Sequence, residues 1–299
     1  MQTHRLTQLV AAAVVAAALA APGSAGAIVL GKHDVGGVAR SGVFPYVAAL
    51  VYSGQSALDG QFCGASVISP GAVLTAAHCV HGMTTGQIAV VTGSTLLSDE
   101  RHGQRTAVAQ IVIHPHYSDD SMAHDVAVLL LAHDVAAPPI AVAGRRDAGV
   151  DAPGVKARVA GWGDISNGQD DGPDALRWTS VDVRSDRTCR HSYGDDYLRS
   201  TMLCAGGNTA DPCGGDSGGP LVATGRDGAA RQIGIVSFGG DRCGQPGVPG
   251  MYARVSSDGA WIQALLATST RATGILPGVR QTAARLPPLL TRRRRAGDS

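Results

Sequence analysis

Charge is scarce in this sequence, and neither sign dominates. Charged residues make up 16% of the 299 residues, and the formal net charge at pH 7 is +1. Without a basic excess, the overall charge gives no reason to expect nucleic-acid binding. Glycine is abundant instead, with 40 residues, which favours tight turns over long solvated helices. The apolar content of 44% suffices for one large or two small hydrophobic cores.

Long hydrophobic runs are missing except near the N-terminus, where residues 9–21 read LVAAAVVAAALAA after Arg5. This run is too short to cross a bilayer, which takes about 20 residues. Small residues suited to signal peptidase follow at 18–20 and 25–27. We predict that residues 1–27 form a signal peptide, alone or with a short propeptide, and that the protein is secreted. An uncleaved anchor is the alternative; no later stretch is long enough for stable membrane insertion.

Export changes how the six cysteines are interpreted. An exported chain meets oxidising conditions, so an even number of cysteines favours disulfides, although sequence alone permits more than a dozen pairings. A zinc site is the alternative, because residues 78–81 (HCVH) and 114–116 (HPH) bring ligand types close together. Neither segment has a CxxC partner pair. We therefore expect disulfides, no required metal and no cofactor.

Short apolar runs rich in Val and Ile recur between residues 44 and 255, separated by glycine, proline or polar clusters. This pattern is typical of an all-β barrel or sandwich. A polar break at residues 145–153 is a candidate boundary between two barrels. One helix is expected near the end, because residues 260–267 (AWIQALLA) place their large apolar side chains on one face after the possible caps Ser256, Ser257 and Asp258.

Residues 269–299 have no strong periodicity and end in RRRRAGDS. We predict a basic, disordered tail. A basic arm for an anionic cell surface is the alternative.

Ser217 lies among small residues in GDSGG, which suggests an exposed nucleophile. The motif also fits the nucleophile elbow of α/β-hydrolases, but in those enzymes the histidine follows the serine. Here the last histidine is His191, so the base must lie upstream. His78 ends an apolar strand in LTAAHC. Asp125 opens the run DVAVLLLA, where a buried carboxylate needs a partner such as a histidine N–H.

These motifs together resemble the trypsin-like (chymotrypsin-fold) serine proteases. The resemblance covers residues 28 to about 268. It implies an all-β fold of two six-stranded antiparallel barrels, about 28–144 and 145–255, with the active site in the cleft between them and a C-terminal helix at about 257–268. The segments that carry it are TAAHC (75–79), HDVAVLLL (124–131), GWG (161–163), CGGDSGGPL (213–221), SFGG (237–240) and WIQALL (261–266).

The resemblance assigns a role to each catalytic group. Ser217 is the nucleophile, His78 is the general base and acid, and Asp125 orients the imidazole. The backbone N–H groups of Gly215 and Ser217 form the oxyanion hole. The family pattern also implies three disulfides: Cys63–Cys79, Cys189–Cys204 and Cys213–Cys243.

The residue six before the serine, Asp211, corresponds in this family to the floor of the pocket for the side chain before the cut bond. An acid there implies a preference for Arg or Lys. Gly239 and Gly250 match the pocket walls, and Ser237 matches the residue that supports the buried aspartate. The sequence departs from the usual pattern at Pro212, Phe238 and the rim 240–242, and residues 93–103 lack the acidic pattern of calcium-binding members.

Asp216 matches the acid that pairs with a new N-terminal amine when the zymogen is activated. The candidate amine is that of Ile28, in AIVLG. We therefore expect a monomeric, secreted serine endopeptidase that acts on proteins or peptides. A non-catalytic homologue that serves as a binding module, and an esterase on the same scaffold, are the alternatives.

Overall fold

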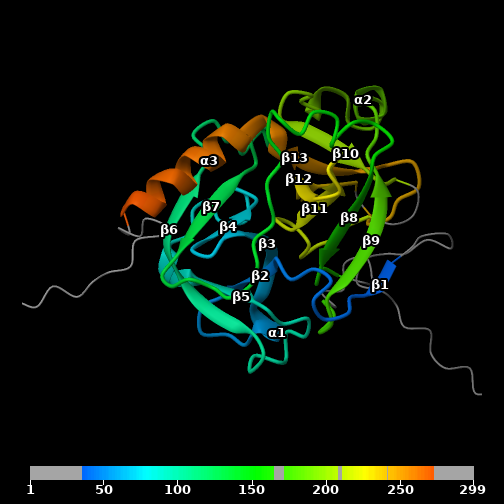
Figure 1. Ribbon diagram of the computed structural model, residues 1–299. Helices are drawn as coiled ribbons and strands as arrows, with labels where there is room; N and C mark the ends of the chain where they lie inside the picture. Colours follow the sequence, from blue (N-terminus) through cyan, green and yellow to red (C-terminus); the bar gives the residue numbers. More distant parts are fainter. Residues whose placement is uncertain (1–35, 165–171, 208–210, 241, 273–299) are drawn as a thin grey trace, which may run out of the picture.

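The structure is a computed structural model, and it describes residues 36–164, 172–207, 211–240 and 242–272 (Figure 1). The expected signal peptide, Ile28 and residues 273–299 of the expected tail lie outside the described residues. Within the described part of the chain strands predominate and helices are few, which confirms the all-β prediction.

Six strands of the first half close into a barrel in the order β2-β3-β4-β7-β6-β5. Every neighbouring pair is antiparallel. Successive side chains of β5 point to opposite faces of the barrel wall. Ile88 and Val90 belong to the core of the barrel, whereas Ala89 and Val91 belong to a second hydrophobic cluster with Trp162 and Leu176 of the second half. The strands are β2 (Val47–Tyr52), β3 (Gln61–Ser69), β4 (Ala72–Thr75), β5 (Ile88–Thr92), β6 (Gln104–Ile113) and β7 (Ala127–Leu131).

The second half forms a seven-stranded sheet in the order β1-β9-β8-β11-β12-β13-β10. Six of its strands come from the region expected to form the second barrel. The seventh, β1 (Gly36–Val38), comes from the first half of the sequence and pairs with β9. The other strands are β8 (Lys156–Gly161), β9 (Arg177–Asp182), β10 (Met202–Ala205), β11 (Pro220–Thr224), β12 (Ala230–Phe238) and β13 (Gly250–Arg254).

The C-terminal helix α3 (Val255–Ala272) lies over the barrel beside β6 and β7 (Figure 1). Its predicted apolar face packs against the barrel core through Ile262, Trp261 and Leu265. The helix begins earlier than expected, so Ser256, Ser257 and Asp258 lie in its first turn rather than before it. None of the described helices is long and apolar enough to span a membrane.

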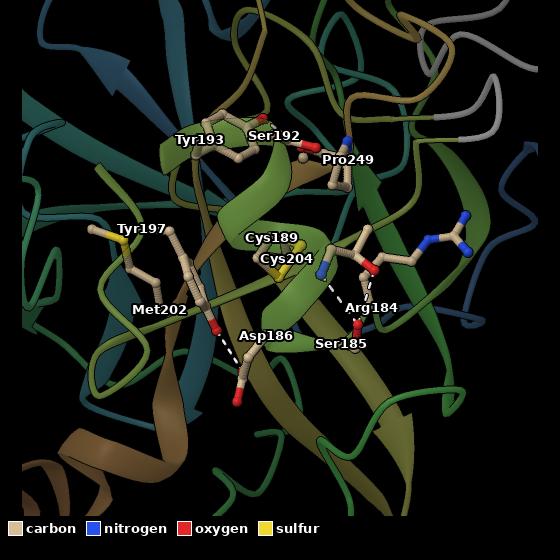
Figure 2. The surroundings of a disulfide bond; sticks show 12 residues. Arg184, Ser185, Asp186, Cys189, Ser192, Tyr193, Tyr197, Met202, Cys204 and Pro249 are labelled. Carbon is tan, nitrogen blue, oxygen red and sulfur yellow. Dashed lines mark hydrogen bonds between the residues drawn. A yellow bond between two sulfur atoms is a disulfide. The ribbon is translucent and has the colours of Figure 1, made fainter. Parts of the chain in front are cut away.

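The remaining helical segments are short: α1 (Ala57–Gly60), η1 (Thr85–Gln87), α2 (Asp186–Tyr193) and η2 (Gly194–Asp196). The Cys189–Cys204 disulfide ties α2 to β10, and the hydroxyl of Tyr193 donates to the carbonyl of Pro249 (Figure 2). This contact supports the chain immediately before β13.

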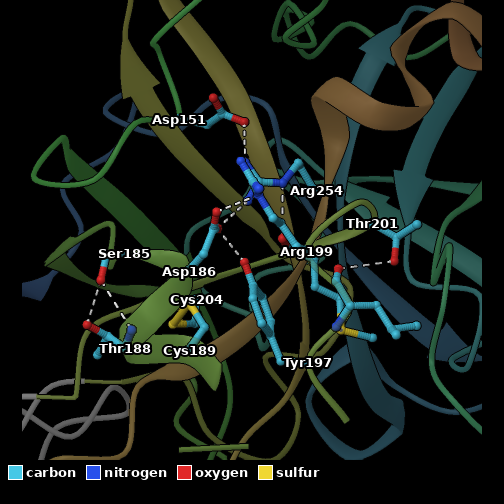
Figure 3. Close-up of polar contacts among 12 residues, drawn as sticks. Asp151, Ser185, Asp186, Thr188, Cys189, Tyr197, Arg199, Thr201, Cys204 and Arg254 are labelled. Atoms are coloured by element: carbon cyan, nitrogen blue, oxygen red, sulfur yellow. Dashed lines mark hydrogen bonds and ion pairs between the residues drawn. A yellow bond between two sulfur atoms is a disulfide. The ribbon is translucent and has the colours of Figure 1, made fainter. Parts of the chain in front are cut away.

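An ion-pair network holds the opposite end of β13 (Figure 3). Arg254 lies 2.8 Å from Asp151 and 3.7 Å from Asp186. Asp186 in turn accepts a hydrogen bond of 2.6 Å from Tyr197 and pairs with Arg199 at 2.7 Å. The disulfide and this network together fix α2 against the edge of the sheet.

The other two disulfides join the pairs that the resemblance implies. Cys63–Cys79 links β3 to the turn after β4. Cys213–Cys243 links the segment before β11 to the loop between β12 and β13. Both crosslinks therefore lie beside the candidate catalytic residues.

Candidate active site

His78 and Asp125 are brought together by two paired strands. Thr75 at the end of β4 lies opposite Ala127 at the start of β7, so the residues just beyond these positions are neighbours. The His78 ring Nδ1 lies 2.7 Å from Asp125 Oδ2, and the His78 backbone N–H donates to Oδ1 at 2.8 Å. Asp125 is fully buried, whereas the His78 side chain is 24% exposed. The carboxylate thus fixes one side of the ring, and the other ring nitrogen, Nε2, lies 3.7 Å from the sulfur of Cys79.

Ser237 completes the surroundings of Asp125. Its hydroxyl, on β12, donates to Asp125 Oδ2 at 2.6 Å. The buried carboxylate therefore has three hydrogen-bonding partners, and it needs no cation to offset its desolvation. Because β12 belongs to the second sheet, this bond also links the two halves of the molecule.

Ser217 lies in the turn that leads into β11. Gly64 of β3 donates to the Ser217 carbonyl at 2.7 Å. Gly218 has a φ of +83°, and a Cβ there would come within 2.2 Å of the Thr75 hydroxyl, so only glycine lets the turn approach the end of β4 this closely. The turn is thereby brought beside the segment that carries His78. Among the described residues no hydrogen bond joins Ser217 Oγ to His78 Nε2; such bonds often tighten only when substrate binds.

The backbone N–H groups of Gly215 and Ser217 have no hydrogen-bond acceptor among the described residues. Gly215 has a φ of +88°, which aims the chain sharply at this point. Gln61 Nε2 donates to the Gly215 carbonyl at 2.8 Å and holds the peptide in place. Two free donors next to a serine hydroxyl are suited to binding an oxyanion.

Asp216 is fully buried beneath this turn. Among the described residues its carboxylate accepts two hydrogen bonds, from the backbone N–H of Gly163 at 2.8 Å and of Cys213 at 2.9 Å. No cationic group of the described residues reaches it. Burial raises the pKa of Asp216 from 3.8 to about 7, against the lowering effect of the two N–H donors.

A cavity of about 210 Å³ opens beside Ser217, with Asp211 in its lining. Ser237, Gly239 and Gly250 also line it, so every residue assigned to the substrate pocket is found there. Asp211 is 4% exposed, and its carboxylate accepts N–H bonds from Gly207 at 3.1 Å and Gly250 at 3.4 Å. A larger cavity of about 530 Å³, lined by Gln61, Phe62 and Leu97 among others, lies on the other side of Gly215.

Sequence reasoning missed three contributors to this site: a pair of glycines, one glutamine and one tyrosine. Gly161 and Gly163 make room for Asp216, since a Cβ at either position would lie within 2.5 Å of its carboxyl group. The GWG motif therefore has a physical reason beyond its resemblance to the family pattern: its two glycines leave space for a buried carboxylate. Gln61 carries no local signal for its role.

The third missed contributor is Tyr252, on β13. Its hydroxyl is buried and has no hydrogen-bond partner among the described residues. Burial raises its pKa well above the usual value, and the charge of Asp211 adds to this effect. A single tyrosine in a β-strand is usually a packing residue, so no local pattern indicates a polar role for Tyr252.

Comparisons with known proteins agree with this geometry. A family model described as Trypsin matches residues 34–262. Trypsin from Saccharopolyspora erythraea is 40% identical over 216 residues, which cover 71% of this chain and 88% of that protein. Trypsin-1 from Astacus astacus is 36% identical over 244 residues, covering 77% and 98%. Neuropsin, a serine protease expressed in the limbic system of mouse brain, has a similar structure, with a TM-score of 0.67 and 30% identity over 77% of this chain and 98% of that one.

Proposed function

The chain belongs to the trypsin family and is a serine endopeptidase, and from this we propose that it is secreted and cleaves peptide bonds after Arg or Lys. The observation that carries the specificity is Asp211, a buried carboxylate in a cavity beside the nucleophile. Secretion is supported by the short apolar run at residues 9–21 and by three disulfides, which persist in oxidising compartments.

In the proposed mechanism, Ser217 Oγ attacks the carbonyl carbon of the scissile bond while His78 Nε2 accepts its proton. Asp125 holds Nδ1–H and stabilises the resulting imidazolium without taking the proton itself. The negative charge that develops on the carbonyl oxygen is met by the free N–H groups of Gly215 and Ser217. His78 then gives its proton to the leaving amine, and a water molecule, activated in the same way, hydrolyses the acyl-enzyme.

The proposed specificity follows from charge and shape. A buried carboxylate is costly unless a cation or hydrogen bonds compensate it, and an Arg or Lys side chain entering the cavity supplies both. Gly239 and Gly250 add no side chains to the cavity wall, which leaves length for such a substrate. The unpaired Tyr252 hydroxyl adds a polar group to the surroundings of Asp211. The larger cavity beyond Gly215 would then receive residues after the cut bond.

The proposed active form begins at Ile28. Its new α-amine would pair with Asp216 and compensate a fully buried carboxylate that accepts two backbone hydrogen bonds among the described residues. Because Ala27 precedes Ile28, a cut after Arg or Lys cannot release this end, so signal peptidase or another protease must do so.

A cleavage profile over a peptide library tests the specificity. We expect cleavage after Arg and Lys, and we expect Asp211→Ser to lower kcat/KM on Arg substrates by about 10²–10⁴-fold, since the substrate cation would be buried without a counter-charge. Asp195→Ser, at an exposed acid, is the matched control and should change nothing. A wild-type profile dominated by Phe or Leu would contradict the proposal. N-terminal sequencing of the active secreted protein tests the start at Ile28, and a fully active form beginning at Ala21 would refute it.

A further inference from the structure

Two histidines and a carboxylate meet in a cluster that is next to Asp125 in sequence and takes no part in lining the substrate cavity. His114 follows β6, His124 precedes β7, and Asp258 lies in the first turn of α3. His124 Nδ1 lies 2.7 Å from Asp258 Oδ1, and His114 Nε2 lies 3.5 Å from the same oxygen. The two imidazole rings stack at 4.4 Å with an angle of 7° between their planes. Three potential ligand atoms thus lie within 4.8 Å of one another.

The three side chains of the cluster differ in their exposure to solvent. The Asp258 side chain is 1% exposed and that of His114 is 7% exposed, whereas His124 is 26% exposed. His116 is exposed nearby, with its ring centroid 5.7 Å from that of His114 and 5.9 Å from that of His124. An ion arriving from solvent would meet His124 first and could take His116 or water as a fourth ligand.

We propose that His114, His124 and Asp258 form a binding site for a divalent transition-metal ion of the zinc class. Two imidazole nitrogens and one carboxylate oxygen, with an open fourth position, are a common ligand set for Zn²⁺. Imidazole nitrogen favours Zn²⁺, Cu²⁺, Ni²⁺ and Co²⁺ over Mg²⁺ and Ca²⁺, which need several oxygen ligands. A second group of possible metal ligands consists of His78, Cys63 and Cys79. Its two cysteines are joined in a disulfide, so they offer no thiolate ligands to a metal ion.

The site is coupled to the proposed catalytic acid through the backbone. His124 immediately precedes Asp125 and has a φ of +49°, a left-handed conformation that is uncommon for a residue with a side chain. Metal–ligand bonds of about 2.0–2.1 Å set tetrahedral ligands about 3.3 Å apart, so the 2.7 Å contact between His124 and Asp258 must open. Asp258 is buried in a helix, so His124 is the side that moves, and Asp125 moves with it. Occupancy therefore lowers protease activity without competing with substrate; this step rests on the proposed function, whereas metal binding does not.

Cobalt binding to the full chain without a histidine tag tests the site directly. Ser217→Ala protein is used so that it cannot digest itself. We expect one equivalent of Co²⁺ to produce the visible absorption of a tetrahedral complex and to quench Trp261, whose ring packs edge-on against His114 at 4.7 Å. Mg²⁺ should do neither. Zn²⁺ should displace the Co²⁺ and abolish the absorption.

Variants assign the ligands. Asp258→Asn and, as a milder change at a second position, His114→Gln should each weaken Co²⁺ binding by about 10-fold or more. His81→Gln removes an exposed histidine outside the cluster and should bind as the parent does. Absence of the absorption, or equal affinity in all variants, overturns the site. In the native enzyme, Zn²⁺ should lower kcat at constant KM. If kcat is unchanged while Co²⁺ is bound, the coupling to Asp125 is wrong but the metal site stands. If the enzyme without metal is inactive on peptides, the proposed function is wrong and the binding result is unaffected.

Discussion

Asp125 and Asp216 are both fully buried carboxylates within the candidate active site, but their surroundings are completed in different ways. Asp125 has three partners that the fold itself provides, two from His78 and one from Ser237. Asp216 has two backbone N–H donors and no cation among the described residues. The hydrogen bonds to Asp125 are complete once the two halves of the molecule pack together, because Ser237 comes from the second sheet. The region around Asp216 is left electrostatically incomplete, which suits it to be completed by a cleavage event.

The largest effect should come from disturbing the complete region. Asp125→Asn keeps the shape of the side chain but offers an N–H where His78 needs an acceptor, so the imidazole is held in the wrong tautomer. We expect kcat to fall by about 10⁴-fold, the loss that this change causes in Ser-His-Asp proteases. Steady-state kinetics on an Arg peptide measure it. A loss below tenfold would remove Asp125 from the mechanism.

Asp216→Asn should have a smaller effect, because it leaves the proposed triad intact. Without the ion pair to the Ile28 amine, the Gly215 and Ser217 N–H groups should no longer be held for the oxyanion. We expect kcat to fall by about 10²–10³-fold, as for the loss of an oxyanion donor. Asp195→Asn, at an exposed acid, is the control. Full activity in Asp216→Asn, with the N-terminus confirmed at Ile28, would show that the two regions do not differ in this way.

The pH dependence of stability separates the two regions further. In a chain that begins at Ala21, Asp216 lacks the amine and keeps a pKa of about 7, against 3.8 for the unfolded carboxyl. The folded state then binds more protons than the unfolded state between these values, so its stability falls as the pH rises through this window. From pH 5 to pH 8 the loss from this group is about 3 kcal/mol. In a chain that begins at Ile28 the proposed ion pair would lower the pKa of this carboxyl, so we expect the loss to be largely removed.

Urea unfolding of both forms at pH 5 and pH 8, each carrying Ser217→Ala, measures this difference. The test depends on the difference between the two forms, since the groups other than Asp216 and the terminal amine titrate equally in both. Parallel pH profiles would contradict the proposed pairing of Ile28 with Asp216.

The sequence predicted the parts of the molecule that local patterns or motifs encode. Short apolar runs rich in Val and Ile predicted the strands. The spacing of Trp261 and Ile262 predicted the buried helix face, and the motif around Ser217 located the turn. The pairing of β1 with the second sheet was not predicted, because three residues carry too little pattern to choose a partner. Asp258 was interpreted as a possible helix cap, since its actual partner, His124, lies 134 residues away.

A substitution in the GWG motif tests the surroundings of Asp216 directly, and it should have the smallest effect of the changes considered. Asp125 has two side-chain partners besides one backbone N–H, whereas the partners of Asp216 are two backbone N–H groups. Asp216 is also bordered by glycine, since a Cβ on Gly163 would lie 2.5 Å from its carboxyl carbon. Gly163→Ala must therefore push the carboxylate aside and weaken the N–H bond that Gly163 donates to it. We expect a loss of about 1–3 kcal/mol in the free energy of unfolding. Gly214→Ala is the matched control, because a Cβ there meets no atom within 4 Å, and its effect should stay within about 0.5 kcal/mol. Urea unfolding of the two variants in the Ser217→Ala background compares them without interference from activity. Equal stability of the two variants would mean that the Asp216 carboxylate can shift without cost. Close packing around Asp216 could then not be what couples the proposed ion pair to the position of the oxyanion-hole N–H groups.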